Sequence, residues 1–246
     1  MILLLDIGNS AVKWAISAED GVVSPTDSCV HREGGIGCVA AIHWQGMSPT
    51  RVVASNVAGE VLAQELCAWV RVAWQVEVLF LCPEAQAFGV RNAYRDPSRL
   101  GADRWAALIG AARRPHGHLC VVDCGTAVTL DALTADNVHL GGLIVPGLRL
   151  MRDALVVGTA GVRFTKSAEE MLLGCDTGSA VVGGTLYAVV ALIERVVAHL
   201  AVELSGAVTV LLTGGDAATV LPLLSSTVEY EPDLVIHGLA VVAKTT

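Results

Sequence analysis

Residues 1–15 read MILLLDIGNSAVKWA, and this stretch decides the fold. An apolar run over residues 2–5 ends at Asp6-Ile7-Gly8-Asn9-Ser10, and residues 12–17 then alternate, with Val12, Trp14 and Ile16 on one face. The pattern predicts a buried strand, a tight turn and a second strand. Gly8 and Asn9 suit a turn with positive φ, whose outward N–H groups can cradle an anion. Asp6, at the strand end, is placed to hold a metal ion.

The same pattern occurs again near the middle of the chain. Residues 118–133 read HLCVVDCGTAVTLDAL, with Asp123 and Gly125 in the places of Asp6 and Gly8. A third related stretch, AVTVLL over residues 207–212, leads into Thr213-Gly214-Gly215-Asp216. One Asp-x-Gly turn is common, but two that are each framed by strand patterns indicate that the two halves are duplicated.

Composition limits the classes of function. The 246 residues are 53% hydrophobic and 16% charged, with a net charge of −8, so the chain can bury a large core and is a poor match for nucleic acid. Its longest uncharged stretches, residues 34–50 and 177–193, contain glycine and polar residues, so we expect no membrane span. No basic segment precedes the first apolar run, and the seven scattered cysteines form no CxxC, so we expect a cytoplasmic protein.

Between the hairpins the chain alternates strand and helix patterns, which predicts an α/β fold with mixed sheets flanked by helices. Residues 113–117 are the best candidate linker between two domains, 1–114 and 115–246. A long helix over residues 179–204 is apolar nearly all round, so it is either central to its domain or packs against a second subunit. The remaining predicted elements are strands at 51–57, 76–81 and 140–149, and helices at 57–73, 105–112 and 217–224.

The three loops resemble the two phosphate loops and the nucleotide loop of the acetate and sugar kinase/Hsp70/actin superfamily. Within it, residues 92–105, with Gly101-Ala102-Asp103-Arg104, and GGLIVPG at 141–147 resemble the type III pantothenate kinases, which share their pattern with Bvg accessory factor proteins. The resemblance covers residues 1 to about 238. It implies two actin-like (ribonuclease H-like) domains with ATP in the cleft between them. The first carries one phosphate loop and the GADR segment, and the second carries the other two loops.

The resemblance also implies a reaction: ATP-dependent phosphorylation of pantothenate to 4'-phosphopantothenate, the first step of coenzyme A biosynthesis. Asp103 would be the general base, although an Asp at this position can equally cap the following helix. Arg104 would grip the pantothenate carboxylate, unless it is an ordinary surface arginine. Thr177 would bind the substrate or serve only as a helix N-cap. The substrate-binding set implied by the family is Tyr94, Gly101, Ala102, Asp103, Arg104 and Thr177.

ATP and its cations would be held by the loops. Asp6 would orient Mg²⁺ and Asp123 would hold a monovalent cation, K⁺ or NH₄⁺. Two departures stand out: Asn9-Ser10 replaces the usual Asn-Thr, and Asp176-Thr177 adds a carboxylate where the family often has Asn-Thr. The implied ATP-binding residues are Asp6, Ile7, Gly8, Asn9, Ser10, Lys13, Thr126, Gly214 and Gly215.

Two other functions are weighed against the kinase. One is a non-catalytic, nucleotide-binding regulatory protein of the Bvg accessory factor type, which would have no need of Asp103. The other is a different superfamily member, such as a sugar kinase or an actin-like ATPase. The expected partners are ATP, pantothenate and a second copy of the chain, bound through the helix near 179–204. We expect the protein to bind neither nucleic acid nor a membrane.

Overall fold

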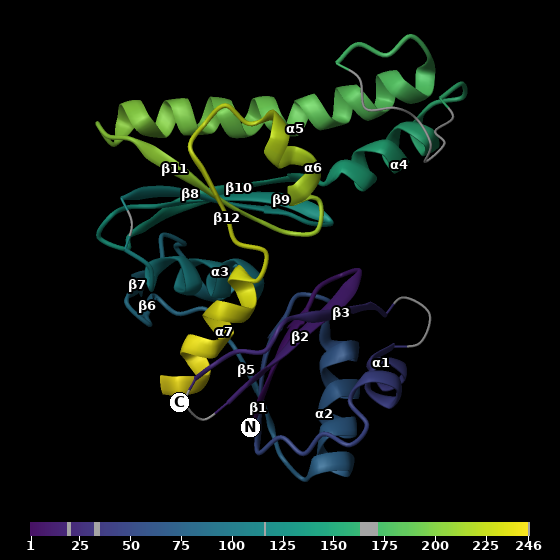
Figure 1. Ribbon diagram of the computed structural model, residues 1–246, viewed down its shortest axis with the longest axis vertical. Coiled ribbons are helices and arrows are strands. Elements are labelled where there is room, and N and C mark those ends of the chain that lie inside the picture. The colour runs from purple at the N-terminus through teal and green to yellow at the C-terminus, as the bar shows by residue number, and fades with distance from the viewer. Residues whose placement is uncertain (19–20, 32–34, 116, 163–171, 246) are drawn as a thin grey trace. The chain divides into compact units, whose positions relative to one another are not determined.

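The computed structural model describes residues 1–18, 21–31, 35–115, 117–162 and 172–245 (Figure 1). Strands and helices alternate along much of the chain. In chain order they are β1 (Ile2–Ile7), β2 (Ala11–Ser17), β3 (Asp27–Val30), α1 (Gly35–His43), β4 (Arg51–Asn56), α2 (Glu60–Trp74), β5 (Val78–Phe80), β6 (Gln86–Ala87), β7 (Val90–Arg91), η1 (Pro97–Arg99), α3 (Ala102–Ala112), β8 (His118–Cys124), β9 (Ala127–Leu133), β10 (His139–Pro146), α4 (Leu148–Gly158), α5 (Thr177–Glu203), β11 (Val208–Thr213), α6 (Ala217–Val220), η2 (Leu221–Leu223), β12 (Val228–Tyr230) and α7 (Leu234–Thr245).

The chain forms two compact units, and it passes between them more than once. Unit 1 comprises Met1–Pro115, Asn137–His139 and Asp233–Thr246, and unit 2 comprises His116–Asp136 and Leu140–Pro232. A single cut near residue 114 therefore does not describe the packing, because the chain returns to unit 1 for three residues after β9 and again for α7. His116, in the predicted linker, lies outside the described residues.

Each unit has its own five-stranded sheet, and the two sheets have the same topology. The strand order is β3-β2-β1-β4-β5 in unit 1 and β10-β9-β8-β11-β12 in unit 2. In each, the central strand pairs antiparallel with its hairpin partner and parallel with the strand on its other side. The duplication and the mixed α/β fold predicted from the two Asp-x-Gly hairpins are confirmed.

Unit 1 buries both faces of β1, as its continuous apolar run requires. Leu3, Leu5 and Ile7 pack with Trp14 and Trp44 in a core that includes residues of α1 and α2. On the sheet's other face, α7 contacts β1 and β4, and α3 contacts β4. The helices α3 and α7 approach each other at two glycines: a Cβ on Gly238 would collide with the carbonyl of Ala106, and one on Gly110 would lie 2.6 Å from the oxygen of Leu234.

Unit 2 is organised by α5, which runs along its sheet (Figure 1). Leu186, Val189 and Ile193 are at most 2% exposed and belong to a core cluster with residues of β8 and β11. By length and composition α5 is the single helix in the described residues that could span a membrane, and its packing against the sheet accounts for the same composition. The predicted strand 140–149 is shorter than expected, because β10 ends at Pro146 and α4 begins at Leu148.

Candidate active site

The first Asp-x-Gly loop closes the β1–β2 hairpin. Asp6 lies opposite Lys13 in the hairpin register, and its carboxylate accepts a hydrogen bond from Ser55 Oγ at 3.2 Å. The amide of Gly8 donates to the carbonyl of Ala11 at 3.0 Å, which leaves Asn9 and Ser10 at the tip of the loop. The loop thus presents a carboxylate, short polar side chains and a lysine on one hairpin.

The prediction that this loop has a positive φ is wrong. Neither Gly8 nor Asn9 has a positive φ. The loop is instead held from outside by His31, whose Nε2 lies 2.7 Å from the carbonyl oxygen of Gly8. Since that oxygen can only accept, Nε2 carries the proton. In a trans peptide the C=O and the next N–H point in opposite directions, so this bond turns the Asn9 amide away from His31.

Ile7 contributes to the loop only through its backbone. Its side chain is fully buried in the core of unit 1, and its carbonyl accepts a hydrogen bond from the Val57 amide at 3.0 Å. Of the residues predicted to bind ATP here, Asp6, Gly8, Asn9, Ser10 and Lys13 have side chains or amides at the loop.

The GADR segment forms the start of α3. The N-cap of this helix is Gly101, not Asp103, and Asp103 lies in the first turn, where its Oδ1 accepts the amide of Arg104 at 2.7 Å. This carboxylate is half-buried, whereas Arg104 is only 6% exposed, so the surface-arginine alternative is wrong. The side chain of Ala102 is also buried, so any contact that it makes with substrate comes from its backbone.

Tyr94 is brought to the same place by the polar loop before η1. Its hydroxyl accepts a hydrogen bond from Arg104 Nη1 at 2.8 Å, and the guanidinium carbon lies 5.6 Å from the ring centroid. The amide of Tyr94 donates to Asn92 Oδ1 at 3.0 Å, a turn that explains the asparagine two residues earlier. Tyr94, Gly101, Asp103 and Arg104, grouped from the sequence, therefore lie together in unit 1.

Unit 2 carries the second loop, and the Thr213-Gly214-Gly215-Asp216 loop packs against it. The amide of Asp216 donates to the carbonyl of Cys124 at 2.8 Å. Gly214 has a φ of +99°, and a Cβ there would collide with the Asp123 carboxylate and lie 2.6 Å from the Cys124 backbone. Only glycine meets both demands. The amide of Gly147, the N-cap of α4, donates to the carbonyl of Thr126 at 3.0 Å, so α4 also begins at this loop.

Burial controls the charges around the second loop. Desolvation, reinforced by the negative charges of Asp123 and Asp216, raises the pKa of the Cys124 thiol to about 12, so this cysteine is neutral and is no nucleophile at neutral pH. Burial also raises the pKa of Asp216, and the positive charge of Arg152 opposes that rise.

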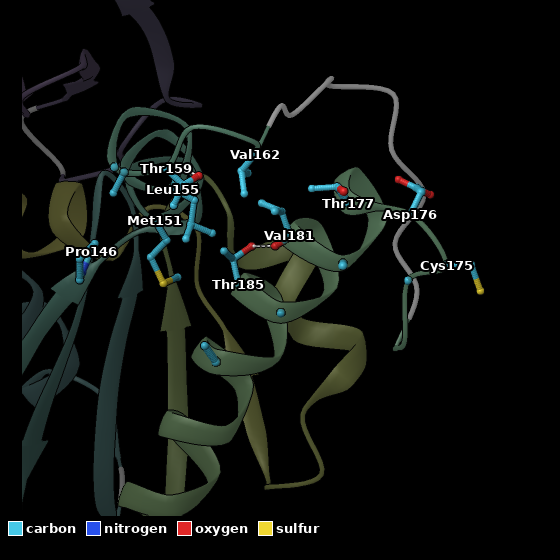
Figure 2. A pocket seen from close by; sticks show the side chains of 16 residues that line it. Pro146, Met151, Leu155, Thr159, Val162, Cys175, Asp176, Thr177, Val181 and Thr185 are labelled. Atoms are coloured by element: carbon cyan, nitrogen blue, oxygen red, sulfur yellow. Dashed lines mark hydrogen bonds between the residues drawn. The ribbon is translucent and has the colours of Figure 1, made fainter.

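Thr177 lies at the edge of a largely apolar pocket in unit 2 (Figure 2). The pocket has a volume of about 1140 Å³ and is bounded by α4 and the first turns of α5, with Met151, Leu155 and Val181 among its lining residues. Thr177 is the first residue of α5, so the N-cap alternative for it is wrong. The cap is Asp176, the residue that departs from the family pattern.

Asp176 caps α5 through Ser179. Its Oδ1 accepts the Ser179 amide at 3.0 Å, and its Oδ2 accepts the Ser179 hydroxyl at 2.6 Å. The Ser179 hydroxyl and then its amide lower the pKa of this carboxyl. The additional negative charge is therefore paired with the helix start, a stabilising position for an acid.

The described residues contain no group of three or more His, Cys, Asp or Glu side chains that could hold a metal ion. Asp6 offers one carboxylate beside the first loop. This fits Mg²⁺, which is commonly bound through one or two carboxylates and substrate phosphates rather than by a complete protein cage. Asp123 offers one carboxylate beside the second loop.

Two buried histidines that the sequence did not single out belong to this site. His31 follows β3 and holds the first loop, and His139 opens β10 and lies beside Tyr94. Both are far in sequence from the groups that they contact, and a lone histidine carries no local signal of such a role.

Comparisons with known proteins match the whole chain. The sequence pattern of the type III pantothenate kinase family matches residues 2–199. A type III pantothenate kinase of Nitrosococcus oceani is 44% identical, covering 100% of this chain and 95% of the relative. One from Herminiimonas arsenicoxydans is 38% identical, covering 99% and 97%.

Solved structures agree on the fold. A Baf family transcriptional activator from Campylobacter jejuni superimposes with a TM-score of 0.64 at 20% identity, covering 99% of this chain and 98% of that one. A 2-dehydro-3-deoxygalactonokinase from Sinorhizobium meliloti gives a TM-score of 0.56 at 15% identity, covering 100% and 99%. Loops, fold and sequence agree, and the chain belongs to the type III pantothenate kinases.

Proposed function

We propose that this protein transfers the γ-phosphoryl group of ATP to the terminal hydroxyl of pantothenate, the first step of coenzyme A biosynthesis. The observation that carries the proposal is the arrangement at the start of α3. There a half-buried Asp103 carboxylate adjoins a buried arginine whose guanidinium is held by Tyr94. A base and an anion-binding group side by side suit a substrate that has a hydroxyl at one end and a carboxylate at the other.

Asp103 acts as the general base. Its carboxylate takes the proton of the pantothenate hydroxyl while the hydroxyl oxygen forms a bond to the γ-phosphorus, and the bond from that phosphorus to the ADP oxygen breaks. General-base assistance of this kind contributes about 10²–10⁴ in rate. The remainder of the barrier is lowered by positioning and by neutralising phosphate charge.

Arg104 binds the pantothenate carboxylate. A guanidinium has five N–H donors, and Tyr94 accepts from one of its nitrogens. Tyr94 and the backbones of Gly101 and Ala102 line the same place. Thr177, exposed at the start of α5, is the remaining substrate residue, and its hydroxyl offers a neutral donor and acceptor.

The three loops bind ATP. In unit 1, Asp6 orients Mg²⁺, residues 7–10 offer amides and short polar groups to the phosphates, and Lys13 supplies a positive charge. In unit 2, Thr126, Gly214 and Gly215 face the nucleotide, and a Cβ on Gly215 would meet no atom within 4 Å. When bound, Mg²⁺ neutralises phosphate charge. Asp123 holds the monovalent cation, K⁺ or NH₄⁺.

The protein acts as a homodimer. Unit 2 exposes large apolar side chains on three stretches: the edge strand β10, the helix α4, and residues 172–173 before α5. Large apolar side chains left exposed in such number are typical of an interface. The sequence predicts that a second copy packs against the helix near 179–204, and we propose that this copy covers these side chains together with the start of that helix. The most exposed of these side chains are Ile144, Val157, Leu172 and Leu173.

Charge substitutions at this face test the dimer. Ile144→Asp and Val157→Asp should each give a monomer by light scattering after size exclusion, whereas Val72→Asp, on the exposed face of α2, should leave the mass unchanged. A wild-type monomer at micromolar concentration would contradict the dimer without touching the catalytic proposal.

We propose that the protein is cytoplasmic. All seven cysteines lie in the described part of the chain and are free thiols, which suits a reducing compartment. The regulatory alternative is not favoured, because the curated relatives are kinases over the full length of this chain.

The deciding experiment measures ADP release from ATP and Mg²⁺, with and without pantothenate, at low and high K⁺, for wild type and Asp103→Asn. Pantothenate-dependent release that falls at least about a hundredfold in the variant supports both the reaction and the base. Equal release in the two proteins removes Asp103 from the mechanism. No release from folded wild-type protein would leave the regulatory function as the better account.

A further inference from the structure

A three-residue segment of the β9–β10 connection belongs to unit 1, although the chain on both sides of it belongs to unit 2. The amide of Arg91 donates to the carbonyl of Asn137 at 3.1 Å, and Val138 forms a parallel bridge with Arg91. The segment therefore extends the pairing of β7, and it delivers the next side chain, His139, to the loop that carries Tyr94.

His139 contacts that loop through its Nδ1 and through the face of its ring. It is 1% exposed, and its Nδ1 lies 3.4 Å from the backbone nitrogen of Ala93, whose N–H it accepts. Its ring is nearly parallel to that of Tyr94, with centroids 6.1 Å apart and planes inclined by 20°. Because Nδ1 accepts, the ring carries a proton on Nε2.

Tyr94 is thus held on two sides. His139 stacks against its ring, and Arg104 donates to its hydroxyl at 2.8 Å. The Asn92 side chain holds its amide. Removing the imidazole would leave an open space beside the tyrosine ring and an Ala93 amide that has lost its side-chain acceptor. The ring could then rotate away from the guanidinium.

We propose that His139 is a positioning residue for pantothenate: it fixes the Tyr94 ring and, through the Tyr94 hydroxyl, orients the guanidinium of Arg104. The inference rests on the proposed function, because it needs Arg104 to bind the substrate carboxylate. It makes a residue from the β9–β10 connection part of the substrate half of unit 1. A residue that only filled space would affect stability and both substrates alike.

The two contacts can be separated by substitution. His139→Phe keeps an aromatic ring and loses the acceptor, His139→Asn keeps an acceptor at the position of Nδ1 and loses the ring, and His139→Ala loses both. We expect the KM for pantothenate to rise about tenfold in the alanine variant and less in the other two, since aromatic pairs and single hydrogen bonds each contribute about two- to tenfold. The KM for ATP and kcat should stay within about twofold.

His31→Ala is the matched control. It removes a second buried histidine of unit 1, at 8% exposure, that contacts the first phosphate loop instead. It should raise the KM for ATP and leave the KM for pantothenate unchanged, the reverse of His139→Ala. Melting curves recorded for all variants establish that folded protein is compared, and the nearly isosteric phenylalanine variant serves if the alanine variant does not fold.

A double-mutant cycle with Tyr94→Ala tests the route of the effect. If His139 acts through Tyr94, His139→Ala raises the KM for pantothenate no further in the Tyr94→Ala background. The inference is overturned if the two substitutions raise the KM for pantothenate multiplicatively. It is also overturned if this KM is unchanged in folded His139→Ala and His139→Phe, or if the KM values for pantothenate and ATP rise equally. Wild-type protein without pantothenate-dependent ADP release would overturn the proposed function itself, which is a different result.

Discussion

Gly101→Ala is predicted to disable catalysis while leaving the fold nearly intact. A Cβ at Gly101 would lie 2.5 Å from Asp103 Oδ1, closer than carbon and oxygen approach without a bond. An ordinary contact of about 3.3 Å requires the carboxylate oxygen to retreat by about 0.8 Å. A misplacement of roughly 1 Å at a reacting group can cost about 10²-fold in rate, so we expect kcat to fall about thirty- to a hundredfold.

The stability of this variant should change little. Gly101 has a φ of −60°, which alanine adopts without strain, and the nearest atom is the end of a side chain that can rotate. Replacing an N-cap glycine by alanine costs less than about 1 kcal/mol. The assay is ADP release at saturating ATP over a pantothenate series, with thermal unfolding followed by circular dichroism.

Gly37→Ala is the matched control for Gly101→Ala. It makes the same chemical change on α1, where a Cβ meets no atom within 4 Å. Its kcat should equal that of wild type. A Gly101→Ala protein with kcat within threefold of wild type, alongside an inactive Asp103→Asn, would refute the reasoning. It would show that the carboxylate can move by most of an ångström without loss.

Three further perturbations have defined outcomes. Gly238→Ala should lower the free energy of unfolding by about 1–3 kcal/mol in urea titrations, because its Cβ collides with the backbone of α3, whereas Gly37→Ala should raise it by about 0.5–1 kcal/mol. Burial raises the pKa of Glu194, but the hydrogen bonds that its carboxylate accepts outweigh burial and lower this pKa. The carboxylate therefore stabilises the fold above its ordinary pKa of 4.5, and the contribution is lost as the pH falls through the lower pKa of the folded state. Glu194→Gln should be less stable than wild type at pH 7, and a stability difference that stayed constant down to pH 3 would contradict this explanation. His31→Ala should raise the KM for ATP about two- to tenfold by freeing the first loop, and an unchanged KM would show that the loop holds its shape without the histidine.

Local patterns were enough to predict the repeated parts of the fold. A continuous apolar run that ends in Asp-x-Gly is typical of a strand buried on both faces, so β1 and β8 could both be recognised as central strands. The helix α5 was also predicted, because an apolar surface nearly all round requires burial. The C-terminal stretch that forms α7 is apolar without a clear period, so its helical state was not predicted.

Loop conformation and capping were predicted less well. Gly8 and Asn9 were expected to have positive φ, but the hairpin closes without it, and the glycine that does need it is Gly214, pressed against the second loop. The N-cap of α5 is Asp176, so capping, the alternative to substrate binding for Thr177, is wrong. Such details are hard to predict because several backbones satisfy the same loop sequence, and the choice depends on neighbours far along the chain.

The sequence by itself determined the duplication, the class of fold, the three loops and the GADR segment, because each depends on residues close together in the chain. Only the tertiary structure decided that α7 and residues 137–139 join unit 1, that His31 holds the first loop, and that His139 and Arg104 hold Tyr94 between them. These contacts join residues 10 to more than 100 positions apart, and they form only where packing against a shared sheet brings the segments within a few ångströms.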